Sequence, residues 1–242
     1  MSSSRLSGKV LRPIVGKPML ALQIERIRRS LLIDEVILAT SKAPENDALE
    51  ALAADIGIPC FRGAEDDVLS RIAGALRAFD VELHVEFMGD NPIPDPGLID
   101  AVIGVYLKHQ GAYDYVTNAL TTTYPPGAEV SVYPASIVLD CDARVTDSAA
   151  REHVGIHIYQ HPERYRILNL EAPSWLRYPD VHLEVDTQED FEVVRAVYEQ
   201  FYPGNPGFSL QQAVEFAVAS GLAERNRRVE RRWRAFRLDE SA

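Results

Sequence analysis

The sequence contains little cysteine and no long apolar stretch. Only Cys60 and Cys141 occur among the 242 residues, far apart and outside any Cys-x-x-Cys pair. This spacing argues against a disulfide framework or a zinc knuckle, and both thiols are expected to be buried apolar side chains. No run of about 18 uncharged apolar residues exists, and residues 1–11 hold no apolar core of a signal peptide. These absences predict a cytoplasmic protein without a membrane-spanning segment.

Positive charge is also scarce, because 25 Lys and Arg residues face 36 Asp and Glu residues, a net charge of −11. Proteins that coat nucleic acids rely on Lys and Arg to neutralise phosphates, so nucleic acid is not an expected partner. An acidic protein that handles a triphosphate needs local cations, supplied by a few basic side chains and by Mg²⁺. A dinucleotide-dependent dehydrogenase is disfavoured, because no Gly-x-Gly-x-x-Gly turn follows a predicted strand.

Apolar residues in the first half of the chain alternate between helical spacing and short strand-like runs. Helical spacing occurs in residues 20–31, 49–56, 68–79 and 98–107, and strand-like runs occur at 35–41, 59–62 and 83–88. This alternation predicts a Rossmann-like α/β fold, with a mostly parallel sheet between two layers of helices. Ligands of such sheets bind beyond the carboxyl ends of the strands, so the chemistry is expected just after Ala39 and Met88.

The second half of the chain has shorter strand signals. Strands are predicted at 115–119, 129–133, 166–170 and 181–185, and helices at 135–141, 148–160, 191–201, 209–221 and 222–236. We interpret this half as a mixed continuation of the same sheet. At this length one main domain is expected over residues 1–202, with an inserted lobe around 114–170. A helical extension is predicted over residues 203–242.

Two carboxylates directly follow predicted strands. Asp90 lies in the turn Gly89-Asp90-Asn91-Pro92, and Asp186 ends the alternating run that precedes a helix. Mg²⁺ takes one or two protein carboxylates and completes its coordination with water and phosphate oxygens. Asp90 and Asp186 are therefore candidate Mg²⁺ ligands, although Asp90 could instead cap the loop that follows it. Thr187 and Asp190 match a helix-capping pattern.

The first nine residues are small, polar and basic. Arg5 and Lys9 lie on a flexible, serine-rich backbone, a combination that suits phosphate binding. A disordered terminus is the alternative interpretation of the same residues.

Short motifs that match one protein family are spread over nearly the whole chain. They are Ser4-Arg5-Leu6-Ser7-Gly8-Lys9-Val10-Leu11, Gly16-Lys17-Pro18-Met19-Leu20, Ala39-Thr40-Ser41, Phe61-Arg62-Gly63, Asp67-Val68-Leu69-Ser70-Arg71, Gly89-Asp90-Asn91-Pro92, Asp114-Tyr115-Val116-Thr117-Asn118, Arg151-Glu152-His153-Val154 and Val185-Asp186-Thr187. In this order they resemble the CMP-sugar synthetases and the spore-coat-polysaccharide type cytidylyltransferases. The resemblance implies a nucleotide-diphospho-sugar transferase fold, with a nucleotidyltransferase domain over residues 1–202 and an acceptor-binding lobe around 114–170. It also implies transfer of CMP from CTP to an acidic sugar or similar acceptor, with release of pyrophosphate, and a homodimer.

The resemblance also implies a role for individual residues. Arg5 and Lys9 would be the catalytic residues that hold the triphosphate, Ala39, Thr40, Ser41, Arg62 and Asp67 would bind the nucleotide, Asp90 and Asp186 would hold Mg²⁺, and Arg71, Asn118, Glu129, Arg151, Glu152 and His153 would surround the acceptor. An arginine suits an acceptor carboxylate or phosphonate through bidentate hydrogen bonds. For Arg71 and Arg151 an ordinary ion pair is an equal alternative.

Two further patterns have competing interpretations. His153, His157 and His161 are spaced to lie on one helical face, but without a His-Glu-x-x-His arrangement a zinc site is the lesser alternative. Residues 225–237 are rich in arginine, with Val229, Trp233 and Phe236 close to one helical stripe. We interpret this tail as a solvated helix that docks on this protein or on a second copy, rather than as a nucleic-acid-binding element.

The chain departs from the family pattern at its beginning. The family has an apolar strand ending in Gln-Ala-Arg before the serine-rich loop, and this sequence lacks it; Ser2 and Ser7 replace Gly and Pro. Loss of a central strand would leave backbone groups unpaired. A non-catalytic relative that binds nucleotide or a partner is therefore an alternative function, and a phosphonate or sugar phosphate is an alternative acceptor.

Overall fold

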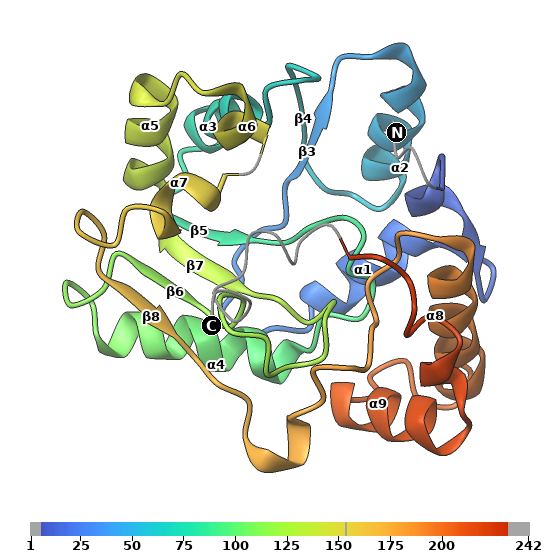
Figure 1. The fold of residues 1–242 in the computed structure, drawn as a ribbon. Helices are drawn as coiled ribbons and strands as arrows, with labels where there is room; N and C mark the ends of the chain where they lie inside the picture. Colours follow the sequence, from blue (N-terminus) through green and yellow to red (C-terminus); the bar gives the residue numbers. More distant parts are fainter. Residues whose placement is uncertain (1–5, 153, 232–242) are drawn as a thin grey trace.

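The structure is a computed structural model that describes residues 6–152 and 154–231 (Figure 1). The first half contains η1 (Lys9–Leu11), β1 (Pro13–Ile14), β2 (Lys17–Pro18), α1 (Met19–Ile27), β3 (Leu38–Ser41), η2 (Pro44–Asn46), α2 (Asp47–Asp55), β4 (Cys60–Gly63), α3 (Val68–Ala78), β5 (Leu83–Glu86) and α4 (Pro96–Lys108). The second half contains β6 (Tyr115–Thr117), β7 (Ser131–Pro134), α5 (Ala135–Arg144), α6 (Ser148–Glu152), α7 (Ile156–Tyr159), β8 (Ile167–Asn169), η3 (Ser174–Leu176), α8 (Gln188–Phe201), α9 (Leu210–Ala219) and η4 (Leu222–Glu224). The predicted alternation of helices and strands is confirmed.

The strands of the described residues form a mixed, divided sheet. Four of them pair in the order β5-β7-β6-β8, where β7 runs antiparallel to both neighbours and β6 runs parallel to β8. β3 and β4 form a separate parallel pair, and β1 and β2 form a small antiparallel hairpin. Within the described part of the chain, β3 pairs with β4 alone and β5 pairs with β7 alone.

Helices cover both faces of the four-stranded sheet. Figure 1 shows α4 below the sheet and α3, α5 and α6 above it, with α8 packed against α9 and against β1. Strand alternation directs Val116 and Val132 into the larger core with α1, α4, α8 and α9, and Tyr115 and Tyr133 into the core under α3, α5, α6 and α7. A third, smaller core joins α1, α2 and the β3–β4 pair.

Local capping signals explain where several helices begin. Asp67 accepts a hydrogen bond from the Ser70 N–H at the start of α3, and Asp95 accepts one from the Leu98 N–H at the start of α4. Pro96 occupies the first turn of α4, where its missing N–H has no consequence. The predicted Thr187–Asp190 capping box of α8 is confirmed.

Three predicted elements are wrong in detail. Residues 181–185 are not a strand, because their hydrogen bonds go to two separate loops, Leu183 N–H to Pro126 and Val185 N–H to Asp90. The helix predicted at 148–160 is split into α6 and α7. The helix predicted at 222–236 is only the short η4 within the described residues, which end at Arg231. The chain bends there to bury Asn226 and Arg231.

The two cysteines lie in separate cores. Cys141 is a buried residue of α5 and Cys60 is half-buried on β4, and burial raises the pKa of both thiols. None of the described helices is long and apolar enough to cross a membrane.

Candidate functional site

The predicted pair of aspartates meets at the side chain of Lys9. The Lys9 ammonium lies 3.1 Å from a carboxylate oxygen of Asp90, 3.1 Å from one of Asp186 and 2.6 Å from the Val185 carbonyl oxygen. The Lys9 side chain is only 10% exposed, whereas those of Asp90 and Asp186 are 36% and 19% exposed. The site is therefore a pair of carboxylates, open to solvent on one side, with a cationic group held between them.

The loops that carry the two aspartates are tied together by main-chain and side-chain hydrogen bonds. The Val185 N–H donates to the Asp90 carbonyl oxygen at 2.8 Å. From α1, the Gln23 amide donates to the carbonyl oxygens of Met88 and Asn91 at 2.7 and 2.9 Å, on either side of Asp90. Because these bonds span both loops, the spacing of the carboxylates is set by the fold and not by the side chains alone.

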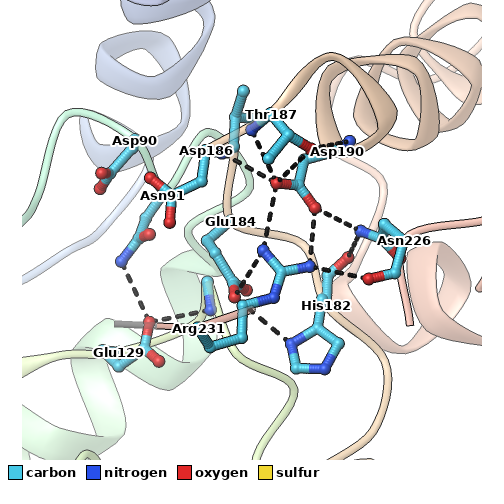
Figure 2. A network of polar contacts seen from close by, with 12 residues as sticks. Asp90, Asn91, Glu129, His182, Glu184, Asp186, Thr187, Asp190, Asn226 and Arg231 are labelled. Atoms are coloured by element: carbon cyan, nitrogen blue, oxygen red, sulfur yellow. Dashed lines mark hydrogen bonds and ion pairs between the residues drawn. The ribbon is translucent and has the colours of Figure 1, made fainter. Parts of the chain in front are cut away.

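The carboxylate of Asp190 holds the main chain at Asp186. Asp190, fully buried at the start of α8, accepts hydrogen bonds from the N–H groups of Asp186 and Thr187 at 3.0 and 2.9 Å (Figure 2). The backbone of Leu183 and Glu184, just before Asp186, lies close to Gly127. A Cβ on Gly127 would lie 2.5 Å from the Glu184 nitrogen, and the φ of 102° at this position also suits glycine.

The electrostatics of the pair favour a bound cation. Burial raises the pKa of Asp90, and the charge of Asp186 raises it further, while the ammonium of Lys9 acts in the opposite direction. A positive group placed between two carboxylates offsets the repulsion between their negative charges. Lys9 supplies this group in the structure, so the space between the carboxylates accommodates a cation. Their hard oxygen donors are of the type that Mg²⁺ prefers.

The residues predicted to bind the nucleotide lie on β3, β4 and the start of α3. Thr40 and Ser41 are buried at the end of β3, beside Ala39. The Arg62 guanidinium bonds to the Ser41 carbonyl oxygen and forms ion pairs with Asp47 and Glu50. The Asp67 carboxylate caps α3 and pairs with Arg151. The nucleotide-binding roles of Ala39, Thr40, Ser41, Arg62 and Asp67 stay predictions.

Among the residues predicted to bind the acceptor, Glu129 lies next to the aspartate loop. Its carboxylate accepts hydrogen bonds from the Asn91 amide at 3.0 Å and from the Gly127 N–H at 2.9 Å (Figure 2). Asn118 bonds to the backbone of Ala128 and Val130 and holds the loop before β7.

The other predicted acceptor residues lie near α3 and α6. Arg151 forms ion pairs with Asp67 and Asp142, and Arg71 donates to backbone carbonyl oxygens of the loop before α3. Glu152 is exposed on α6. Arg151 therefore forms ordinary ion pairs, as the alternative interpretation of this residue expected. Its contact with an acceptor stays a prediction.

Several predicted residues lie outside the described part of the chain. These are Arg5, His153, Trp233 and Phe236. The helix that would have aligned His153 with His157 and His161 is interrupted before α7. Among the described residues no group of three or more His, Cys, Asp or Glu side chains could hold a metal ion. A histidine zinc site is therefore not formed by the described residues.

Sequence reasoning missed the residues that support the aspartates from outside their own loops. Gln23 had a usable signal, since it is a polar residue within the apolar stripe of α1. Asn226 and Arg231 had none, because Arg231 looks like its exposed neighbours Arg227 and Arg228 in the sequence. Only the path of the chain after α9 brings them to Asp190.

Comparison with known proteins confirms the resemblance drawn from the motifs. The sequence matches the cytidylyltransferase family model over residues 1–222. It is 35% identical over 205 residues to the spore coat polysaccharide biosynthesis protein SpsF of Bacillus subtilis (strain 168), a match covering 83% of each chain. It is 32% identical over 130 residues to the 3-deoxy-manno-octulosonate cytidylyltransferase of Zea mays, covering 52% of this chain and 41% of that one.

A solved structure agrees with this family match. A cytidylyltransferase from Leptospira borgpetersenii serovar Hardjo-bovis (strain JB197) superposes with a TM-score of 0.88 at 23% identity, covering 96% of this chain and 95% of the other. At that identity the superposition shows the fold, and the nucleotidyltransferase-like α/β architecture is the predicted one. The family model and the SpsF match show the family, and the chain therefore belongs to the cytidylyltransferases, a family of nucleotidyltransferases.

Proposed function

We propose that the chain transfers CMP from CTP to an acidic sugar or a similar small acceptor, as a step toward a surface polysaccharide or glycoconjugate. Family membership supports the nucleotidyl transfer, and the names of the Bacillus and Zea mays relatives support the acceptor class. The observation that carries the proposal is the convergence of Asp90 and Asp186 on one cationic position, occupied by the Lys9 ammonium.

The transfer forms one bond and breaks another at the same phosphorus. A hydroxyl oxygen of the acceptor bonds to the α-phosphorus of CTP and loses its proton to solvent. The bond from that phosphorus to the bridging oxygen breaks, and pyrophosphate leaves with the electron pair. Lys9 supplies positive charge beside the aspartates, and Arg5, four residues earlier, would add a second cation for the triphosphate.

Asp90 and Asp186 would hold Mg²⁺ between the protein and the triphosphate. When bound, the metal would neutralise phosphate charge and reduce its repulsion of the attacking oxygen. Gln23 holds the main chain on either side of Asp90, and Asp190 holds the main chain at Asp186. Glu129 fixes the Asn91 side chain next to Asp90.

Calorimetry of CTP binding, with and without Mg²⁺, tests this proposal. We expect the parent chain to bind CTP in a Mg²⁺-dependent manner, and the Asp90→Asn, Asp186→Asn double variant to lose that dependence. Asp55→Asn, an exposed position at the end of α2, is the matched control and should bind like the parent. Pyrophosphate release with a panel of 2-keto-3-deoxy sugar acids, phosphonates and sugar phosphates then identifies the acceptor class. Mg²⁺-independent CTP binding by a folded parent chain contradicts the metal assignment.

Nucleotide binding without turnover is a second candidate function. It is favoured by the separation of the β3–β4 pair from the four-stranded sheet, because Ala39, Thr40 and Ser41 belong to that pair. A loosely positioned nucleotide would lose the alignment on which phosphoryl transfer depends. CTP binding without pyrophosphate release for any acceptor in the panel would favour this candidate over the transferase.

A further inference from the structure

Residues 223–231 lie beyond the family match, which ends at residue 222, yet they contact residues that support the aspartate pair. Residues Arg225, Arg227 and Arg228 of this segment are exposed. Asn226 and Arg231 are buried instead, with 0% and 4% of their surface exposed. Burial of a single arginine in an otherwise exposed basic segment indicates a specific partner within the fold.

Arg231 binds two buried carboxylates at once. Its guanidinium donates to both carboxylate oxygens of Asp190 at 2.7 and 3.1 Å, and it lies 3.1 Å from a carboxylate oxygen of Glu184. A third hydrogen bond goes to the Asn226 carbonyl oxygen at 3.1 Å. Asn226 in turn donates its side-chain amide to Asp190 at 2.8 Å and to the His182 carbonyl oxygen at 3.1 Å (Figure 2).

Asp190 links this cluster to the candidate cation site. One of its oxygens accepts hydrogen bonds from the N–H groups of Asp186 and Thr187 as well as from Arg231. The same carboxylate therefore holds the main chain of Asp186 on one side and the Arg231 guanidinium on the other. Figure 2 shows these groups in one continuous network, with the Asp186 side chain directed away from Arg231 and toward Asp90.

Helix capping alone does not account for Arg231. A capping box needs the Asp190 carboxylate and the Thr187 hydroxyl, and both are supplied within the first turn of α8. The buried carboxylates of Asp190 and Glu184, however, both contact the Arg231 guanidinium, at 2.7 and 3.1 Å, and the capping box needs neither contact. A guanidinium group can donate hydrogen bonds to two carboxylates at once, and the Asp190 carboxylate can still accept hydrogen bonds from main-chain N–H groups.

We propose that Arg231 is a positioning residue for the Asp90 and Asp186 cation site. It holds the Asp190 carboxylate in place through two hydrogen bonds, Asp190 holds the Asp186–Thr187 main chain, and the Asp186 carboxylate then faces Asp90. This inference rests on the proposed function for the identity of the cation. It adds that a segment outside the matched family region completes the support of the site.

The test uses the full chain and compares Arg231→Gln, Arg231→Lys and Asn226→Ala with the parent. Arg227→Gln is the matched control, because Arg227 belongs to the same segment but is exposed and, within residues 6–152 and 154–231, forms an ion pair with the exposed Glu224 alone. Two readouts are measured. The first is hydrogen exchange of the Asp186 and Thr187 amides by NMR, and the second is Mn²⁺ affinity in the presence of CTP by electron paramagnetic resonance.

We expect the two amides to exchange at least ~10-fold faster in Arg231→Gln, and Mn²⁺ to bind about 10-fold more weakly, as when the support of a metal ligand is lost. Arg231→Lys should recover part of both effects, and Arg227→Gln should match the parent. Unchanged exchange and Mn²⁺ affinity in folded Arg231→Gln would overturn the inference. If that variant does not fold, Asn226→Ala decides, because it removes one donor to Asp190 and leaves no charge unpaired. Faster exchange of the same two amides supports the inference, and unchanged exchange overturns it.

The two proposals fail separately in this experiment. If the parent binds no Mn²⁺ with CTP, the metal assignment of the proposed function is wrong. The exchange of the Asp186 and Thr187 amides still decides whether Arg231 orients this turn.

Discussion

Replacing His84 on β5 should change how the stability of the protein depends on pH. The Nε2 atom of His84 is buried without a hydrogen-bond partner, and the ring packs edge-on against Tyr133 at 5.1 Å between centroids. Burial lowers the pKa of this histidine from 6.5 to about 4. His84 therefore stays neutral in the folded protein at pH values where an unfolded chain already binds a proton.

The sign and size of the effect follow from this difference. Because the unfolded state binds the extra proton between pH 6.5 and about 4, the free energy of unfolding falls as the pH falls through that window. Each pH unit corresponds to about 1.4 kcal/mol for one proton. Between pH 7.5 and pH 5 the loss is about 1 to 2 kcal/mol, where the lower figure allows for the part of the half-buried ring that water reaches.

Urea denaturation of the parent and of His84→Phe at pH 7.5 and pH 5 measures this loss. The variant keeps an aromatic ring against Tyr133 but does not titrate, so its stability should rise relative to the parent by about 1 to 2 kcal/mol on going to pH 5. Val85→Ala, the next residue on β5, is a control whose effect should be the same at both pH values. Equal pH dependence of the parent and His84→Phe would refute the assignment of a lowered pKa to the His84 ring.

Two other predictions concern the supports of the fold. Asp67→Ala should destabilise the protein by about 1 to 2 kcal/mol at pH 7, since it removes the cap of α3 and a partly exposed ion pair with Arg151. Burial acts to raise the pKa of Asp67, but hydrogen bonds from Arg151 and the Ser70 N–H hold it below its ordinary value, so the ion-pair part is full above about pH 4. This ion-pair contribution should disappear as the pH falls through the lowered pKa of Asp67 in the folded protein. Thermal denaturation of the parent and of Asp67→Ala from pH 7 to pH 3 measures it. A stability difference between the two proteins that stays constant over this range would contradict the prediction. In native-state hydrogen exchange, amides of β3 and β4 should exchange faster than those of β6, because β6 is hydrogen-bonded on both sides and β3 and β4 form an isolated pair; equal protection would show that the two units open together.

Much of the fold could be predicted because its signals are local. The apolar stripe of α1, the Asp95-Pro96 start of α4 and the capping box at Thr187 each depend on residues within one or two turns of helix. The failure at residues 181–185 has an equally physical reason. The alternation of this run matches a strand, but its backbone hydrogen bonds go to Pro126 and Asp90, which lie in loops that no local pattern connects to it.

The order of the motifs and the local periodicity were enough to identify an α/β cytidylyltransferase and to single out Lys9, Asp90 and Asp186. Lys9 lies in a recognisable motif, and the two aspartates follow strand-like apolar runs of the sequence. Only the tertiary structure placed the Lys9 ammonium between the two carboxylates, separated by 81 and 177 positions in the chain. It also singled out Arg231 from its neighbours. Burial and ion pairing depend on which distant segments the fold brings together, and the sequence around an arginine carries no record of that choice.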